Sequence, residues 1–375
     1  MRVIVLCGTR PEVIKMAPVV MALKETAGIE PILCFTGQHR SMAEMAMRVF
    51  GLTPDIDLNV MKPGQSLEGL TASLLTALHT VFDEWKPDLV LVQGDTTSAM
   101  VGALVAFYRG VRVGHVEAGL RTGNMQHPWP EEANRRIVGL FAWRHYTPTS
   151  VATGNLLREH VDPRTILETG NPVVDALQWV RTRIEGDKSY QKRFEEKLGA
   201  FGQGRKVVLV TGHRRESFGH GFEAMCRAIR EIASTPDTSV VYPVHLNPNV
   251  REPVNRILGG IENVHLLEPL AYDEFVFMMS RAHVILTDSG GVQEEAPSLG
   301  KPVLVMRETS ERREAIDAGS AKLVGTSFER IVSETTELLT DAKAYAAMAH
   351  VSNPFGDGTA SKQIAEDILR NAANP

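Results

Sequence analysis

Three acidic residues in the first half of the chain stand where parallel strands are expected to end or a helix to begin. Asp95 lies in QGDTTSA, Glu117 in HVEAGLR, and Glu131 opens a helical segment in HPWPEEANR. Carboxylates that share a site can be driven to different pKa values, so that one accepts a proton while another donates one. The pattern favours proton-transfer chemistry. The structural alternatives are a helix cap for Asp95, a satisfied interior acid for Glu117 and a helix-start charge for Glu131. Glu132 competes with Glu131 for that last role.

Basic side chains and a glycine turn at other expected strand ends suit a phosphate. In TDSGGVQEE, Ser289, Gly290 and Gly291 join an apolar run to a helical segment, so their backbone N–H groups can hold an anion. Arg10 and Lys15 open the first helical segment after GTRPE, which lacks the GxGxxG pattern of dinucleotide sites. We interpret both as side-chain ligands of a diphosphate. The alternatives are solvated helix charges and an ordinary tight turn.

Three further residues extend the candidate nucleotide site. His213 and Arg312 each follow an expected strand and are suited to a diphosphate. Glu295 lies one turn into the helix beyond the glycine turn, where its carboxylate can accept hydrogen bonds from ribose hydroxyls. Its structural alternative is stabilisation of the helix N-terminus.

The composition is that of an ordinary globular protein. Of the 375 residues, 43% are hydrophobic, and the formal net charge is −5. That charge argues against nucleic acid or an anionic membrane as the main partner. The apolar start leads directly into GTRPE, and no apolar run reaches the roughly 18 residues of a membrane span. We therefore expect a cytoplasmic protein.

Neither a disulfide framework nor a metal site is expected. The cysteines Cys7, Cys34 and Cys226 are scattered and form no CxxC pair, so we interpret them as reduced core thiols. The sequence has no HExxH motif, and His115 and His213 are weak evidence for a metal beside the acids already named. The chemistry is expected to use no cofactor.

Short β-branched runs alternate with helical segments, which is typical of parallel βαβ sheets whose ligands bind at the carboxyl ends of the strands. We predict an α/β protein with two doubly wound Rossmann-like domains facing a cleft. The boundary is expected where the chain turns charge-rich and helical, which gives residues 1–170, with the helix of 358–375 packing back on them, and residues 171–357. The expected strands are 2–7, 30–36, 88–93, 112–117 and 165–170 in the first domain, and 207–212, 239–244, 264–270, 283–290 and 301–306 in the second.

Several long motifs, in this order, carry a resemblance to a known family. They are GTRPEVIKMAP, QGDTTSA, HVEAGLRT, PWPEEANRR, TGHRRESFG, DSGGVQEEAPSLGKPVLVMRETSERREA and NPFGDG. Together they resemble the non-hydrolysing UDP-N-acetylglucosamine 2-epimerases over nearly the whole chain. The resemblance implies the two-domain glycosyltransferase type B fold, UDP-GlcNAc as the small-molecule substrate and a homodimer.

The resemblance also implies a mechanism. UDP is eliminated with loss of the C2 proton to give 2-acetamidoglucal, and is then added back with protonation on the opposite face. The product, UDP-ManNAc, would supply units for surface polysaccharide synthesis. The family pattern implies that Asp95, Glu117 and Glu131 form the acid/base set, and that His213 helps UDP to depart. The residues implied to hold UDP are Arg10, Lys15, Leu270, Phe275, Ser289, Gly290, Gly291, Glu295 and Arg312.

One motif departs from part of the family. Members that a second UDP-GlcNAc activates carry two glutamines in a loop, whereas here GQHRSM keeps Gln38 and His39 but has Ser41 in place of the second glutamine. Any allosteric activation is therefore expected to be weaker or differently built. The alternative functions are a retaining glycosyltransferase, a hydrolysing epimerase and a non-catalytic nucleotide-sugar sensor. The three acids count against the transferase and the sensor.

Overall fold

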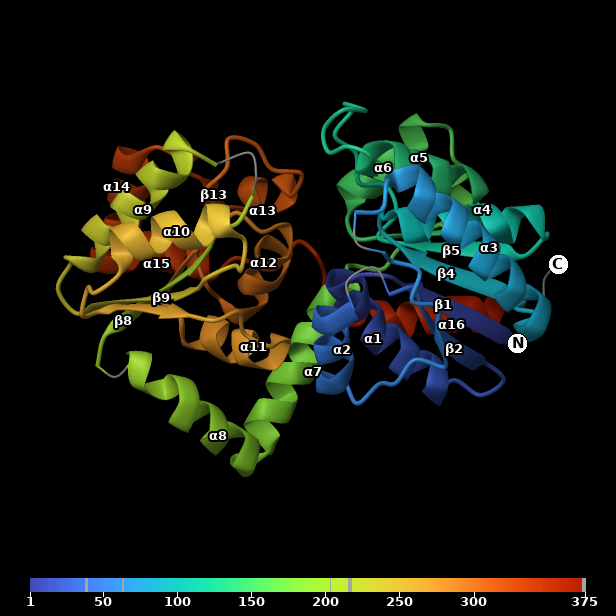
Figure 1. The fold of residues 1–375 in the computed structure, drawn as a ribbon, viewed down its shortest axis with the longest axis horizontal. Coiled ribbons are helices and arrows are strands. Elements are labelled where there is room, and N and C mark those ends of the chain that lie inside the picture. Colours follow the sequence, from blue (N-terminus) through green and yellow to red (C-terminus); the bar gives the residue numbers. More distant parts are fainter. Residues whose placement is uncertain (38–39, 63, 203, 215–217, 373–375) are drawn as a thin grey trace. The chain divides into compact units, whose positions relative to one another are not determined.

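The computed structural model describes residues 1–37, 40–62, 64–202, 204–214 and 218–372, which fold into two units (Figure 1). Unit 1 contains Met1–Ala176 and the chain from Phe355 onward, and unit 2 contains Leu177–Pro354. The first change of unit falls inside helix α7 (Pro172–Gly186), a few residues beyond the expected boundary. Each unit has a parallel sheet with interleaved helices, so the predicted α/β class is confirmed.

The sheet of unit 1 has the strand order β3-β2-β1-β4-β5-β6-β7 within the described residues, and all neighbouring strands are parallel. Because β4 pairs with β1 on the side away from β2, the order of the strands reverses there, which is where doubly wound sheets bind ligands. The strands are β1 (Arg2–Cys7), β2 (Glu30–Phe35), β3 (Ile56–Asp57), β4 (Leu89–Gln93), β5 (Arg112–Val116), β6 (Arg144–Thr147) and β7 (Ile166–Glu168).

Two groups of helices pack in unit 1. One group is α2, α1 and α16, and the other is α3, α4 and α5, whose apolar side chains form one core with β1 and β4. Helix α3 begins at the cap Ser66, whose hydroxyl accepts the Gly69 N–H at 3.2 Å. The helices are α1 (Arg10–Glu25), α2 (Arg40–Val49), α3 (Leu67–Trp85), α4 (Thr97–Tyr108), α5 (Glu131–Phe141), α6 (Ser150–Arg158) and α16 (Ala360–Ala372), with a 3-10 turn at Pro163–Thr165.

Unit 2 repeats the plan with the strand order β10-β9-β8-β11-β12-β13, again parallel within the described residues. Buried apolar residues of β8, β9 and β11 are continuous with those of α9, α10 and α14. The strands are β8 (Lys206–Thr211), β9 (Thr238–Pro243), β10 (Val264–Leu267), β11 (Val284–Thr287), β12 (Val303–Val305) and β13 (Ala321–Leu323).

The helices of unit 2 also pack in groups. Helix α9 lies beside α10 and α14, and α11 lies beside α8. Every helix of both units, as far as the chain is described, is too short or too polar to cross a bilayer. The helices are α8 (Lys188–Leu198), α9 (His220–Ala233), α10 (Pro248–Leu258), α11 (Tyr272–Arg281), α12 (Gly290–Glu295), α13 (Arg313–Ala318), α14 (Phe328–Thr340) and α15 (Ala342–Ala349), with 3-10 turns at Gly199–Gly202 and Ala296–Leu299.

Three strands were not anticipated from the sequence. Strands β3 and β13 have two and three residues and lie at sheet edges, so neither presents a run of apolar residues. Strand β6 reads RHYT, in which His145, Tyr146 and Thr147 are all buried although two of them are polar. Partners within the fold satisfy these polar groups, and a sequence pattern does not show such partners.

The C-terminal helix α16 belongs to unit 1 and is held there by a buried carboxylate. Asp367 accepts hydrogen bonds from Arg144 Nε at 2.8 Å and from the Tyr146 hydroxyl at 3.1 Å, and Arg144 Nη2 also contacts it. Ile364 and Ile368 of the same helix are fully buried. Both charge and apolar contact therefore anchor a helix that follows unit 2 in the sequence.

We expect Asp367→Ala to destabilise unit 1 by about 3 kcal/mol, because the change leaves the half-buried Arg144 and the buried Tyr146 hydroxyl without their acceptor. Urea titration would measure the loss. The control is Glu366→Ala on the same helix, whose exposed pair with Lys362 at 3.8 Å should contribute below about 1 kcal/mol. Equal effects of the two changes would contradict the anchoring role.

Candidate functional site

The predicted acids of unit 1 follow neighbouring strands of the sheet. Asp95 follows β4 and Glu117 follows β5, and the two strand ends are joined by a hydrogen bond from Gly94 N–H to the Val116 carbonyl at 3.0 Å. Glu117 has a φ of +62°, a left-handed conformation that is uncommon outside glycine. Such a conformation persists only where surrounding contacts impose it, and it is often found at functional sites.

Glu117 forms a buried ion pair with Lys15 of α1. The Lys15 Nζ atom lies 2.8 Å from Oε1 and 2.7 Å from Oε2, and both side chains are less than a tenth exposed. Gln93 at the end of β4 also donates from Nε2 to Glu117. The sequence suggested Lys15 as a diphosphate ligand and did not anticipate this pairing. The ion pair joins α1, β4 and the end of β5 at one point.

Asp95 is held by two consecutive residues of α5. Arg135 places Nε and Nη2 at 2.8 Å from Oδ2 of Asp95, and Asn134 Nδ2 donates to the Asp95 carbonyl at 2.8 Å. Both residues of α5 are buried, whereas the Asp95 side chain is about a quarter exposed. The N-terminal turns of α5 therefore fix the carboxylate while leaving it accessible.

The same helix separates the roles of its two adjacent acids. Glu132 is fully buried and accepts N–H groups of Thr122 at 3.0 Å and Gly123 at 3.2 Å, as well as Arg135 Nη1 at 3.2 Å. Glu131 opens α5 and is half-buried. Glu132 therefore anchors the loop before α5.

A fourth acid, Glu12, was not singled out from the sequence. It is buried and accepts from Gly8 N at 3.1 Å, from Thr9 N and Oγ1 at 2.7 Å each, and from Thr96 Oγ1 at 2.8 Å. Burial raises the pKa of Glu12 to about 7, although these hydrogen bonds act to lower it. Glu12 thereby connects Gly8 and Thr9, which precede the start of α1 at Arg10, to Thr96, the residue after Asp95. The capping-box pattern of Thr9 and Glu12 was the available signal.

At the corresponding edge of unit 2, Asp288 organises the end of β8. This fully buried residue follows β11, and its Oδ2 accepts the backbone N–H groups of His213 at 2.7 Å and Arg214 at 2.8 Å. Oδ1 lies 3.4 Å from Nδ1 of the His213 ring. The sequence indicated His213 and the glycine turn but not the aspartate between them.

The glycine turn of unit 2 is packed against Arg312. A Cβ atom on Gly290 would lie 3.0 Å from Arg312 Cζ, so a larger residue would push against the guanidinium. Arg312 Nε donates to Glu294 Oε1 at 2.8 Å, and its charge lies near Glu311. Burial acts to raise the pKa of Glu311, but the hydrogen bond from Arg307 and the charges of Arg312 and Arg307 outweigh it and lower the value to about 2. The turn is therefore bordered by an ordered set of ion pairs.

The remaining residues of unit 2 lie on α11 and α12 or near them. The Tyr272 hydroxyl donates to Glu295 Oε1 at 2.6 Å, and both side chains are buried. Leu270 is buried before α11, and Phe275 within α11 is half-buried. Gln293 Nε2 donates to the carbonyl of Ser289 at 3.0 Å. Tyr272 is thus a further residue that the sequence did not indicate.

The candidate residues therefore form two groups, each at the carboxyl edge of its own sheet. Gln38 and His39 lie outside the described residues. The group in unit 1 is Arg10, Lys15, Asp95, Glu117 and Glu131, and the group in unit 2 is His213, Leu270, Phe275, Ser289, Gly290, Gly291, Glu295 and Arg312.

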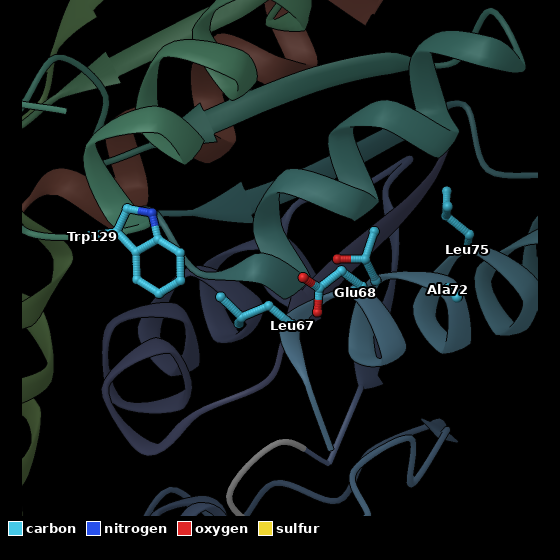
Figure 2. Close-up of a pocket in the computed structure, with 6 residues that line it drawn as sticks. Leu67, Glu68, Ala72, Leu75 and Trp129 are labelled. Carbon is cyan, nitrogen blue, oxygen red and sulfur yellow. The ribbon is translucent and has the colours of Figure 1, made fainter. Parts of the chain in front are cut away.

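A pocket of unit 1 lies on α3, and none of its lining residues is a predicted site residue. In Figure 2 the Trp129 side chain lies at one end of the pocket, and the labelled side chains of α3 extend from there toward the other end. Trp129 is 62% exposed and stands two residues before Glu131. The lining residues are Leu67, Glu68, Thr71, Ala72, Leu75 and Trp129.

We expect the stability effects of changes at Lys15 and Glu117 to be strongly coupled. Lys15→Met should cost about 3 kcal/mol, because it leaves a buried carboxylate without its cation, and adding Glu117→Gln should recover part of that loss. Urea titration of the four chains of the cycle would measure the coupling. The exposed pair Arg181–Glu185, at 2.8 Å, is the control and should give below about 1 kcal/mol. Additive effects at Lys15 and Glu117 would exclude the coupling.

Glu12 makes stability depend on pH. The folded chain keeps a proton that the unfolded chain loses between pH 4.5 and about 7, so the stability contributed by Glu12 is greatest at acidic pH and falls as the pH rises through 7. Glu12→Gln removes this titration. We expect its stability relative to the parent chain to rise by about 2–3 kcal/mol from pH 4.5 to pH 8.

Urea titrations of both chains across that pH range would measure the difference. Glu25→Gln, at an exposed position of the same helix, is the control and should follow the parent chain. A constant difference between Glu12→Gln and the parent would mean that Glu12 does not titrate in this range.

Comparison with known proteins relates these two groups of residues to a family. A sequence profile of the UDP-N-acetylglucosamine 2-epimerases matches residues 21–369. The UDP-N-acetylglucosamine 2-epimerase of Escherichia coli K12 is 52% identical over 372 residues, which cover 99% of each chain. In fold, the chain is similar to UDP-GlcNAc 2-epimerases from two other organisms.

The first is the Neisseria meningitidis enzyme bound to UDP-GlcNAc, with a TM-score of 0.95, 46% identity, and coverage of 99% of this chain and 100% of that one. The second is the Methanocaldococcus jannaschii enzyme in complex with UDP-GlcNAc and UDP, with a TM-score of 0.83, 30% identity and the same coverage. The matched sequence and fold extend over both units. The chain belongs to the UDP-N-acetylglucosamine 2-epimerase family.

Proposed function

We propose that this chain interconverts UDP-GlcNAc and UDP-ManNAc by reversible inversion at C2. The observation that carries the proposal is the buried Glu117, held by Lys15 and Gln93 on the strand next to the one that presents Asp95. The relatives support the substrate, since one is bound to UDP-GlcNAc and another to UDP-GlcNAc and UDP. The product would supply ManNAc-derived units for surface polysaccharide synthesis.

The chemistry of the sugar explains why elimination is needed. The C2 proton of UDP-GlcNAc is not next to a carbonyl, so direct removal would leave a poorly stabilised carbanion. In the proposed route a base takes the C2 proton, the C–H electrons form the C1–C2 double bond, and UDP departs from C1 with the electrons of the C–O bond. Addition of UDP to 2-acetamidoglucal, with a proton delivered to the opposite face of C2, completes the inversion.

The acids of unit 1 are suited to the two proton transfers. One face of C2 requires a base and the other an acid, so more than one ionisable group must reach the sugar. Asp95 is fixed by Arg135 but remains partly exposed, and Glu131 is half-buried at the start of the helix that carries Arg135. We propose Asp95, Glu117 and Glu131 as this acid/base set.

The residues of unit 2 are suited to the departing nucleotide. We propose that His213 and Arg312 contact the diphosphate together with Ser289, Gly290 and Gly291. Donors placed at the leaving oxygen stabilise the charge that develops as the bond to C1 breaks. Glu295, oriented by Tyr272, would accept hydrogen bonds from the ribose hydroxyls, and Leu270 and Phe275 would lie at the uracil end. Arg10 of unit 1 would add a second cation, and Lys15 would act mainly through Glu117.

Proton NMR of the purified protein with UDP-GlcNAc in D2O tests the reaction directly. We expect UDP-ManNAc to appear with deuterium at C2, and the C2 proton of the remaining UDP-GlcNAc to be lost, without added metal or nicotinamide. Release of free ManNAc and UDP would instead indicate a hydrolysing enzyme. Binding of UDP with no change in UDP-GlcNAc would overturn the proposal in favour of a transferase or a sensor.

The carboxylate variants test the assignment of roles. Asp95→Asn, Glu117→Gln and Glu131→Gln should each lower turnover by about 10²–10⁴-fold, the usual contribution of a general acid or base, with a much smaller effect on UDP affinity. Glu84→Gln, at an exposed position of α3, is the control and should leave turnover unchanged. Lost UDP binding with near-normal turnover at saturation would show that these acids do not transfer protons.

A further inference from the structure

Asp288 combines complete burial with a carboxylate oxygen that lacks a partner. Oδ2 accepts the two backbone N–H groups of His213 and Arg214, whereas Oδ1 accepts no hydrogen bond from any residue that the structure describes. A buried carboxylate oxygen without a donor is unfavourable. The Nδ1 atom of the His213 ring lies 3.4 Å from Oδ1, slightly beyond an ordinary hydrogen bond, so a small movement of the ring would let a proton on Nδ1 supply the missing donor.

A second histidine constrains the plane of the His213 ring. The rings of His213 and His245 are stacked, with centroids 5.1 Å apart and planes 12° apart. His245 Nδ1 accepts the backbone N–H of Asn247 at 3.1 Å, so the proton of the neutral His245 ring is on Nε2. Burial and the neighbouring His213 lower the pKa of His245, while the charge of Asp288 opposes them.

We propose that Asp288 fixes the neutral His213 ring in the Nδ1–H tautomer, so that the stacked histidines His213 and His245 have opposite tautomers. The Nδ1 proton then stays on the ring and is donated in a hydrogen bond to the Asp288 carboxylate. Nε2 is the nitrogen that exchanges a proton with a ligand. The His213 side chain is 45% exposed, so a ligand can reach it. Asp288 is thus a positioning residue for His213.

The consequence for turnover rests on the proposed function. When UDP departs, a His213 ring protonated on both nitrogens can hand its Nε2 proton to the leaving diphosphate oxygen, which leaves the neutral Nδ1–H ring, and the ring recovers that proton on Nε2 when UDP is added back. The hydrogen bond from Nδ1–H to Asp288 stays intact during both elimination and re-addition. A His213 ring in the other tautomer would present Nδ1 to Asp288 without a proton, so acceptor would face acceptor and the ring would lose its orientation.

The tautomers can be measured without any substrate. In ¹⁵N-histidine-labelled full-length protein, about two pH units above the ordinary histidine pKa of about 6.5, NMR couplings from the ring nitrogens to the carbon-bound ring protons distinguish the two tautomers. His213→Gln and His245→Gln assign the signals. We expect an Nδ1–H ring for His213 and an Nε2–H ring for His245. An Nε2–H ring at His213 would overturn the proposal, whether or not the chain is an epimerase.

Asp288→Asn provides the second test. The amide oxygen can still accept the two backbone N–H groups, which turns its NH₂ group toward His213 Nδ1 and should invert the His213 tautomer. A comparable aspartate-to-asparagine change beside a catalytic histidine is known to lower turnover through the wrong tautomer. We expect kcat to fall by about 10²-fold or more, with KM and the melting temperature little changed.

Asp175→Asn in unit 1 is the matched control. Asp175 is also buried, accepts a backbone N–H, from Ser361 at 2.7 Å, and has an Oδ2 without a hydrogen-bond partner among the described residues. The Asp175→Asn change should leave the tautomers of both His213 and His245, and kcat, unchanged. An inverted His213 tautomer with unchanged kcat in Asp288→Asn would overturn the positioning role. Absence of epimerase activity in the parent chain would count against the proposed function and leave the tautomer result intact.

Discussion

The buried pair of Lys15 and Glu117 sets the constraint on which unit 1 depends. A charge moved from water into a protein interior is unfavourable unless a partner compensates it in good geometry. Here the partners come from the first helix and from the residue after β5, and Gln93 adds a donor from β4. These elements must therefore meet at one point of the sheet edge, and the left-handed backbone of Glu117 is the local conformation that brings its carboxylate there.

The same principle arranges the surroundings of that pair. Arg135 lies between Asp95 and Glu132, and Glu12 collects four donors from the loops after β1 and β4. Each buried acid is thus matched by cations or by donors that secondary structure leaves unused. An edge built in this way resists rearrangement, because moving one loop would leave a charge or a donor in a neighbouring loop without its partner. Rigid placement of this kind suits groups that exchange protons with a substrate.

The sequence predicted the parts of the fold that repeat and the residues that follow strands. Ten strands appear as β-branched runs, and Asp95, Glu117 and His213 could be found because polar residues end those runs. It did not predict which groups pair with one another, since Lys15 and Glu117 are 102 positions apart. Asp288 was overlooked for the same reason, because the fold brings its backbone donors to it and no spacing of residue types reveals that. Glu12 was overlooked although its capping-box spacing from Thr9 was visible in the sequence.

Unit 2 is inserted into the chain of unit 1, because α16 is separated from the rest of its own unit by Leu177–Pro354. During synthesis from the N-terminus, unit 1 therefore leaves the ribosome without the helix that packs on α1 and that pairs Asp367 with Arg144. At about 5–20 residues per second, the roughly 180 residues of unit 2 take about 10–40 s to make. For that time the nascent chain exposes the surface that Ile364 and Ile368 later cover. The first part to be translated is thus the last to be completed, and chaperones that shield apolar surface have a defined interval in which to act on it.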